Sequence, residues 1–355
     1  MKFIHCSDLH LDSPMERNLS AAQARERSAE LCAAFGRLVD YAVEQGVRAV
    51  LIAGDLFDTP WPRAGTAGFV LDRIRGAATV DFLLLPGNHD GSLFAGMEIP
   101  ENLKLFGPEW ATFRYGDVTV SGMAPEGDGW QTLYDGLRLQ AEDTNIVLLH
   151  GQEAPSPGIE QIALPKLAWK SIHYLALGHI HSYRQRTLAD GCICCYSGCL
   201  EGRGFDECGR KGFVLLEAGE GRVNAQFVPF ALRTVHEVAV DITGLISEEE
   251  IRTALIRESA GIPEDDLVKF LLTGSFTPDT RKDIRFLHRQ LLGRFYALKI
   301  MDQSTLALDP HAFAHDISLK GEFIRLVLAS DRPDGEKERI ILMGLRALRG
   351  EEVAP

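Results

Sequence analysis

The chain has 355 residues, which suits a large domain followed by a smaller one. Its composition, 45% hydrophobic and 25% charged, is typical of an ordinary globular protein. The net charge of −13 excludes a protein whose whole surface grips nucleic acid through phosphate contacts, because such proteins are basic. The sequence carries neither a secretory signal nor a run of roughly 18 apolar residues, so we expect a cytoplasmic protein with no membrane partner.

Short apolar runs alternate with helical patterns over the first 230 residues or so. Continuous runs bounded by turn residues are typical of strands buried on both faces. Such runs lie at residues 3–4, 47–53, 82–85, 146–149 and 174–177. Between the first two, apolar residues from Leu31 to Ala42 recur at helical spacing, and Gly46 is expected to end that helix.

Shorter strand-like segments with many glycines follow from about residue 113. They lie at residues 118–120, 192–196, 213–217 and 225–228. Together with the earlier runs they predict an α/β fold with two sheets and helices on the outside.

A second unit is expected from about Thr234. Its pattern alternates strands at 235–240, 267–272 and 295–300 with helices that begin near Ser247 and at 279–292, which predicts a small α+β domain. Two amphipathic helices follow from about Leu319. We therefore predict three parts, at residues 1–232, 233–308 and 309–355.

The seven cysteines include five between Cys192 and Cys208. Their spacing is not the paired C-x-x-C of structural zinc sites. We interpret them as free thiols that behave as small apolar side chains. A zinc or redox cluster is the alternative.

Five segments place metal-binding side chain types directly after predicted strands. They are residues 8–10, 54–58, 87–90, 150–151 and 178–181, and they contain five of the eleven histidines. Alone, each segment is more often a hydrogen-bonded polar pair, a turn or a single satisfied histidine. Because the carboxyl ends of strands in an α/β sheet converge, all five together predict a two-metal phosphoesterase site. The glycines at 54, 87, 151 and 178 are expected to let the backbone turn beside the metals.

In all five motifs and in their order, the chain resembles the calcineurin-like metallophosphoesterases, whose four-layer sandwich is the fold we expect here. The resemblance implies a first metal held by Asp8, His10, Asp55 and His181. It implies a second metal held by Asp55, Asn88, His150 and His179. Asp55 would bridge two divalent ions, expected to be Mn²⁺ with Fe or Zn²⁺ as alternatives. A water between them would act as hydroxide and attack phosphorus in line.

The same resemblance assigns catalytic roles to His89 and Asp58. His89 would face the phosphate and help the leaving oxygen depart, and Asp58 would hydrogen-bond His89 and keep it protonated. Asp90 is interpreted as structural. For Asp12, a role beside the metal ligands and a solvated loop position remain equal alternatives.

Local segments at residues 5–14, 54–59, 196–198 and 211–213 resemble the SbcD-like and YhaO-like DNA-repair exonucleases. That branch implies a small capping domain after the catalytic domain and an SMC-like ABC ATPase partner that binds C-terminal helices. The amphipathic helices after residue 319 are either such a docking surface or packed on their own domain, and the two alternatives remain equal. The segment 65–74 is a candidate homodimer contact. Arg203, Arg210 and Lys211 are candidates for a basic rim near the metals, which would favour the nuclease; simple solvation of any of them is the alternative.

Three functions follow from these patterns. The leading one is a Mn²⁺-dependent DNA exonuclease or endonuclease in repair. A phosphodiesterase for small nucleotides or other phosphoesters is the alternative enzyme. A metal-lacking scaffold for an ATPase is the third, and the complete set of ligand types disfavours it.

Overall fold

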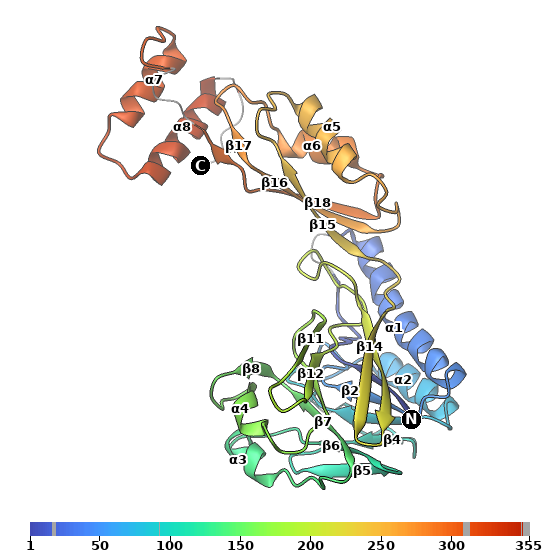
Figure 1. Cartoon of the computed structure of the whole chain (residues 1–355). Coiled ribbons are helices and arrows are strands. Elements are labelled where there is room, and N and C mark those ends of the chain that lie inside the picture. The colour runs from blue at the N-terminus through green and yellow to red at the C-terminus, as the bar shows by residue number, and fades with distance from the viewer. Residues whose placement is uncertain (16–18, 92, 308–312, 349, 351–355) are drawn as a thin grey trace. The chain divides into compact units, whose positions relative to one another are not determined.

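The computed structural model describes residues 1–15, 19–91, 93–307, 313–348 and 350. It divides into two compact units, Met1–Val235 and His236–Pro355. The elements of each unit are labelled in Figure 1.

The first unit contains two six-stranded sheets (Figure 1). The first sheet has the order β14-β13-β1-β2-β3-β4. Its strands are β1 (Lys2–Cys6), β2 (Ala49–Ala53), β3 (Asp81–Leu85), β4 (Leu103–Leu105), β13 (Gly212–Gly219) and β14 (Arg222–Pro229). The first four run parallel, so their carboxyl ends share one edge, and the β13–β14 hairpin adds to β1 in antiparallel register.

The second sheet has the order β11-β12-β10-β7-β6-β5. Its strands are β5 (Ala111–Tyr115), β6 (Val118–Gly122), β7 (Thr144–His150), β10 (Tyr174–Gly178), β11 (Arg184–Thr187) and β12 (Ile193–Tyr196). The four inner strands are parallel and the two edge strands antiparallel. A separate pair, β8 (Gln152–Ala154) and β9 (Gln161–Ala163), follows β7 directly.

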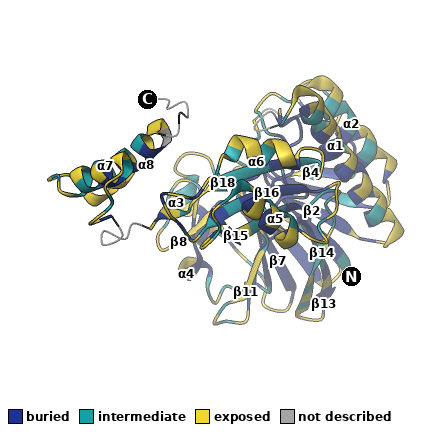
Figure 2. Ribbon diagram, turned by 90° about the horizontal axis from the view of Figure 1, so that it is seen from above, coloured by how far each residue is buried: buried dark blue, intermediate teal, exposed yellow. Residues whose placement is uncertain are grey.

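Alternation of side chains along the buried strands produces the layers, since successive residues point to opposite faces. On β1, Phe3 joins the apolar cluster between the sheets, which includes Ile146 of β7, whereas Ile4 faces the cluster under α1 (Ala21–Glu44) and α2 (Ala64–Gly76). The second sheet packs its other face against α3 (Gly129–Gly136) and α4 (Leu164–Leu167). Figure 2 shows the buried residues concentrated on the strands and on the inner faces of the helices. The predicted four-layer sandwich is therefore confirmed.

Local signals in the sequence set the limits of the helices. Ser20 caps α1 in a reciprocal capping box with Gln23, and the chain leaves the helix through Gly46 at φ 61°. Asp12 is buried, and its carboxylate accepts hydrogen bonds from Arg63 N and Thr66 Oγ1, both at 2.6 Å. Asp12 therefore anchors the start of α2, and the solvated alternative is wrong.

The second unit has the predicted α+β order. A sheet of β15 (Val235–Asp241), β16 (Leu267–Thr273) and β18 (Ala297–Asp302) carries α5 (Glu248–Glu258) and α6 (Ile284–Leu291), and β17 (Ser275–Phe276) pairs with β19 (Thr305–Leu306). Ser247 and Glu250 form a capping box at α5. The predicted helix at 279–292 is shorter than expected, because Asp283 caps it and Asp279 instead pairs with Lys320 at 2.6 Å.

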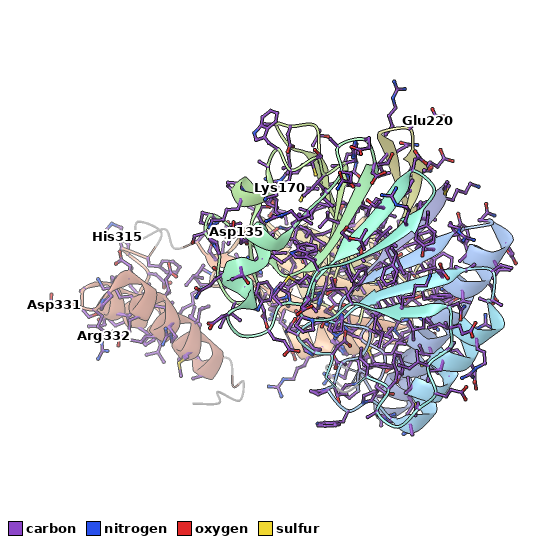
Figure 3. All side chains as sticks on the ribbon, turned by 90° about the horizontal axis from the view of Figure 1, so that it is seen from below. Asp135, Lys170, Glu220, His315, Asp331 and Arg332 are labelled. Atoms are coloured by element: carbon purple, nitrogen blue, oxygen red, sulfur yellow. The ribbon has the colours of Figure 1, made fainter. Side chains whose placement is uncertain are left out.

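Two further helices, α7 (Leu319–Leu328) and α8 (Asp334–Leu348), complete this unit. They pack closely, since a Cβ on Gly344 would lie 2.1 Å from the Phe323 ring. The predicted limit between residues 308 and 309 lies outside the described residues. Polar side chains such as Asp135 and Glu220 point outwards (Figure 3). Across the described ranges, none of the helices has the length and apolar composition that crossing a bilayer requires.

Candidate metal centre

The loops that carry the predicted ligands have an unusual backbone. Asp8, His10, Asp55 and His179 all adopt positive φ, at 53°, 44°, 52° and 100°. Side chains other than glycine rarely adopt this conformation, which costs of the order of 1–3 kcal/mol per residue and concentrates at functional sites. Hydrogen bonds between the loops hold it in place, from Asp8 N to Gly54 O and from His10 N to Asp55 O, both at 3.0 Å.

Glycines allow these loops to approach closely. A Cβ on Gly54 would lie 2.0 Å from His150 Nδ1, and one on Gly87 would lie 2.2 Å from Asp55 Oδ1. A Cβ on Gly178 would meet the backbone oxygen of Ala53 at 1.7 Å. The glycines predicted to flank the site are therefore required by close contacts between its side chains and backbone.

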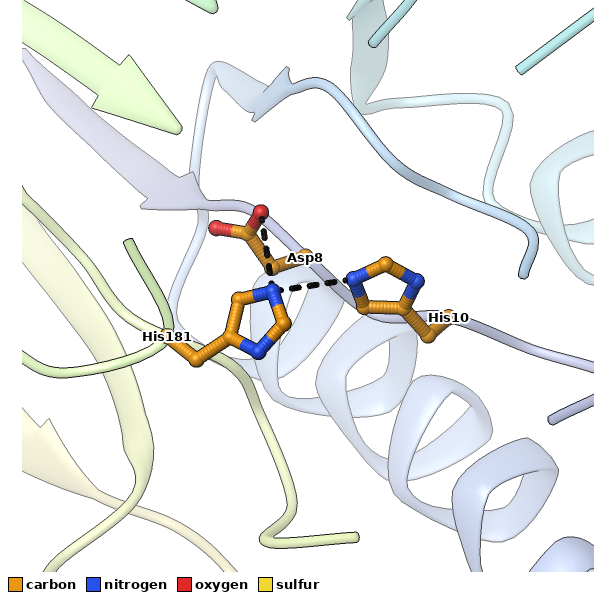
Figure 4. A group of neighbouring side chains, drawn as sticks. All are labelled: Asp8, His10 and His181. Atoms are coloured by element: carbon orange, nitrogen blue, oxygen red, sulfur yellow. Dashed lines mark hydrogen bonds and ion pairs between the residues drawn. The ribbon is translucent and has the colours of Figure 1, made fainter. Parts of the chain in front are cut away.

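Three predicted ligands from distant parts of the chain form a first group. Asp8, His10 and His181 point towards one another in Figure 4. His10 Nε2 lies 3.1 Å from His181 Nε2, and Asp8 Oδ1 lies 3.8 Å from the same His181 nitrogen. Carboxylate and imidazole donors at this spacing can share one divalent cation.

A second group forms around His150. Its Nε2 lies 2.9 Å from Asn88 Oδ1 and 3.4 Å from Asp55 Oδ2, and His179 Nδ1 lies 3.4 Å from the same Asn88 oxygen. Asp55 Oδ2 also lies 3.7 Å from His10 Nε2. The Asp55 carboxylate thus stands between the two groups, where it can serve both.

Three imidazoles of the centre each have one nitrogen engaged by the protein and the other directed into the centre. His10 Nδ1 contacts Asp58 Oδ1 at 3.0 Å, His181 Nδ1 contacts Glu207 Oε1 at 2.7 Å, and His150 Nδ1 contacts the Ala53 carbonyl oxygen at 2.9 Å. Such contacts orient the rings of metal-binding histidines. The donor set and its orientation fit two divalent cations that share one carboxylate.

Glu207 and Arg203 support the first group, and their roles were not predicted. Arg203 donates to Asp58 Oδ1 at 2.8 Å and, through Nη2, to Glu207 Oε1 at 2.9 Å. Burial raises the pKa of Glu207, but the hydrogen bonds from His181 and Arg203 outweigh it and hold this pKa well below its usual range. The two residues lie close together in an irregular loop, where no helical spacing could have indicated their pairing.

Two residues expected on a basic rim are instead committed inside the protein. Arg203 is mostly buried between the two carboxylates, and Lys211 is buried and donates to the His181 carbonyl oxygen at 2.7 Å. Only Arg210 of the three is exposed. Arg203 and Lys211 are therefore not available on an exposed rim, because Arg203 pairs with two carboxylates and Lys211 binds a buried carbonyl oxygen.

The predicted hydrogen bond between the Asp58 carboxylate and His89 is also wrong. His89 Nδ1 lies 3.3 Å from the backbone oxygen of Asp58, while the carboxylate contacts His10 and Arg203. Burial raises the pKa of Asp58, but the hydrogen bond with His10 and the charge of Arg203 lower it further than burial raises it. Asp58 therefore orients a predicted ligand rather than His89.

Asp90 has the structural role expected of it. Its carboxylate accepts hydrogen bonds from the backbone N–H groups of Leu56, Phe57 and Gly87 at 3.0–3.1 Å. It therefore fixes the loop of Asp55 against the loop of Asn88 and His89.

The centre has a buried side and an open side. Asp8, His10, Asp55 and His150 are at most 4% exposed, whereas Asn88, His89 and His179 reach solvent. Burial and the neighbouring His150 lower the pKa of His179, which favours the neutral ring that binds metals. A substrate would therefore approach on the side of Asn88, His89 and His179.

The cysteines take no part in this centre. All seven are free, and the candidate metal groups found among the described residues contain none of them. Burial raises the pKa of Cys194 to about 11 and of Cys195 to about 12. The interpretation as free thiols that behave as small apolar side chains fits these environments.

Comparison with known proteins agrees with this geometry. A family model described as calcineurin-like phosphoesterase matches residues 1–196. The uncharacterized metallophosphoesterase YhaO of Bacillus subtilis is 28% identical over 78% of this chain and 69% of its own length. Two proteins described as DNA double-strand break repair protein Mre11 are also similar. That of Saccharolobus solfataricus is 24% identical over 99% of this chain and 96% of its length, and that of Sulfurisphaera tokodaii 25% identical over 78% and 74%.

Proposed function

The chain belongs to the calcineurin-like phosphoesterase family of metal-dependent hydrolases, as its motifs predicted, and we propose that it is a two-metal nuclease that hydrolyses DNA in repair. One observation carries the proposal. The Asp55 carboxylate stands between two groups of donors, a spacing suited to a pair of ions that act together on one phosphodiester. The relatives described as DNA double-strand break repair proteins support DNA as the substrate class.

The residues divide into two ligand sets. Asp8, His10, Asp55 and His181 would hold one ion, and Asp55, Asn88, His150 and His179 the other. When bound, two divalent cations would acidify a water molecule and stabilise the charge that develops on the phosphate. We propose Mn²⁺ as the ion, because hard carboxylate and amide oxygens accompany the imidazoles here.

His89 is proposed as the proton donor to the leaving oxygen. Its backbone N–H donates to Asp55 Oδ1 at 2.9 Å, and its Nδ1 contacts the Asp58 carbonyl oxygen, so the ring is positioned at two points. The ring carries a second nitrogen, Nε2, which in the protonated form can donate to an oxygen of the substrate. Asp58 assists indirectly, because it holds His10.

Local positive charge beside the centre supports binding of a polyanion despite the net charge of −13. A cavity of about 380 Å³ is lined by Ile180, which lies between two predicted ligands in the sequence, and by Arg184 and Arg186 of the exposed strand β11; Arg186 pairs there with Glu153, and Arg184 is the other cationic group of the lining. Arginine forks bind phosphate oxygens well. We assign this rim to the DNA backbone in place of Arg203 and Lys211.

A small nucleotide or another phosphoester is the second candidate substrate. The size of that cavity favours it, because about 380 Å³ falls within the ~300–1,000 Å³ range of small-molecule sites.

Two partners belong to the same proposal. Ile317, Leu319 and Leu326, on or beside α7, are 99%, 71% and 64% exposed, which suits contact with an SMC-like ABC ATPase. A second copy of the chain would contact α2.

Purified protein with Mn²⁺ should degrade linear DNA, and His89→Ala should abolish this while both ions remain bound. His315→Ala removes an exposed histidine and should leave the rate unchanged. Metal analysis of the purified protein identifies the ion. Hydrolysis of bis-p-nitrophenyl phosphate without hydrolysis of DNA would reject the nuclease and favour the small-substrate enzyme.

A further inference from the structure

A second cavity, also of about 380 Å³, opens directly beside the second ligand group. Asn88 and His150 line it on the side of the centre. Loops after β3, β4, β6 and β8 form its other walls, to which α3 contributes Trp130. Nothing in the ligand sets or in the role of His89 explains this cavity.

The β8–β9 segment is held against the His150 loop. Gln152 N donates to the Glu160 carbonyl oxygen at 2.7 Å, and a Cβ on Gly151 would lie 2.8 Å from that same oxygen. Glu160 takes a positive φ of 55° to close this turn. Ile159 and Glu160 are thereby fixed as a wall of the cavity, and Ile159 is 76% exposed.

The lining is apolar and acidic. Trp130, Phe106 and Ile159 provide carbon surface, and Phe106 is buried against Phe113, so Trp130 is the larger accessible ring. Among the described lining residues none is lysine or arginine, whereas Glu126 and Glu160 are acidic. Phosphate would be repelled there, while a neutral flat ring with amide or amino donors suits such walls.

This composition is opposite to that of the cavity lined by Arg184 and Arg186. One cavity thus carries two arginines, of which Arg186 pairs with Glu153, whereas the cavity beside Asn88 and His150 has an aromatic, acidic lining. A nucleotide has the same two parts, an anionic backbone and a neutral base.

We propose that the cavity lined by Trp130 binds the base of a nucleotide that flanks the cleaved phosphodiester, with Trp130 as the stacking surface. This rests on the proposed nuclease function and adds a specificity residue to it. A base in this cavity cannot remain stacked and paired in a duplex, so the enzyme requires an unpaired nucleotide at the cleaved bond.

A single-stranded 12-nucleotide thymidine strand with one tetrahydrofuran abasic residue at its centre tests this directly. Cleavage in Mn²⁺ is mapped at the two bonds that flank the abasic residue and compared with the same bonds in the unmodified strand. Wild-type protein should cleave at least one flanking bond about 5–150-fold more slowly, the range that loss of base–aromatic stacking gives. Because both flanking bonds are mapped, the comparison is valid for an exonuclease that cleaves in either direction along the strand and for an endonuclease.

Variants assign the effect to the cavity. Trp130→Ala should slow cleavage of the unmodified strand to the abasic rate and remove the difference between the two strands. Trp130→Phe should keep most of the difference in cleavage rate between the two strands. Trp169→Ala removes a tryptophan that is 76% exposed elsewhere and should change nothing. Ile159→Ser, at an exposed position, should reduce the difference without affecting folding.

Two results overturn the inference. Equal cleavage of both strands by wild-type protein shows that no base is recognised, and an unchanged difference in Trp130→Ala and Ile159→Ser places recognition elsewhere. If neither strand is cleaved with Mn²⁺, the proposed nuclease function itself fails and the inference falls with it.

Discussion

Replacing Glu207 by glutamine should weaken one metal site and spare the other. Glu207 accepts hydrogen bonds from His181 Nδ1 at 2.7 Å, from Arg203 N at 2.7 Å, from Arg203 Nε at 3.1 Å and from Arg203 Nη2 at 2.9 Å. Glutamine keeps the shape of the side chain, but it loses the charge and turns one acceptor into a donor that faces other donors. His181 then loses the partner that fixes its ring.

The expected size follows from these contacts. A hydrogen bond to a charged group contributes about 1.5–3 kcal/mol, and loss of a partner that orients a metal-binding histidine typically weakens metal binding about 10–100-fold. The two estimates agree, because a 10–100-fold change corresponds to about 1.4–2.7 kcal/mol. The ion held with His150, whose ring is fixed by the Ala53 carbonyl, should change by about twofold or less.

Calorimetric titration of Mn²⁺ into protein stripped with EDTA measures both sites. Glu237→Gln is the matched control, since Glu237 forms a partly exposed ion pair with Lys269 in the other compact unit. Urea unfolding in EDTA separates loss of metal binding from loss of folding. If folded Glu207→Gln protein binds two ions with unchanged constants, the role assigned to Glu207 is wrong.

Three further predictions address the centre and the core that supports it. Asp55→Asn should lower the number of bound Mn²⁺ ions, measured by elemental analysis, from two to one or none, because the Asp55 carboxylate stands between both ligand groups. Retention of two tightly bound ions would contradict this prediction. Gly178→Ala should lower the free energy of unfolding, measured in urea, by several kcal/mol, since the new Cβ would lie 1.7 Å from the Ala53 oxygen. Gly65→Ala, in open space within α2, should instead raise the free energy of unfolding by about 0.5–1 kcal/mol. Equal effects of the two substitutions would show that the loop can move. Burial lowers the pKa of His5 to about 3, so the stability it contributes above pH 6.5 should be lost as pH falls, by up to about 5 kcal/mol near pH 3. His5→Gln should flatten the pH dependence of unfolding in EDTA, and an unchanged slope would exclude His5 as its source.

The strands and the loops of the centre were predictable because their signals are local. Buried parallel strands are continuous apolar runs, and the residues after them must meet at one edge of a sheet. The predicted ligands Asp8 and His181 lie far apart in the chain, yet both follow such runs. The family resemblance supplied the pairing of ligands into two sets, which the runs alone do not contain.

Residues whose role depends on distant partners were not predictable in the same way. Glu207 faces His181 from a loop, and Asp12 binds the start of a helix 51 residues away. Arg203 and Lys211 have the composition of a basic rim, but their neighbours in space are carboxylates and a carbonyl. The type of a charged residue indicates which groups it can bind, but tertiary packing decides whether that residue is buried or exposed.

The position of β1 has a consequence for synthesis of the protein. Lys2 pairs with Glu217 on one side and Phe3 pairs with Ala49 on the other, so β1 is completed by one of the last strands of its unit. A nascent chain on the ribosome therefore carries an unpaired strand edge until β13 has emerged. His181 and Glu207 also come late in this unit, so translation products that end before them lack part of the centre.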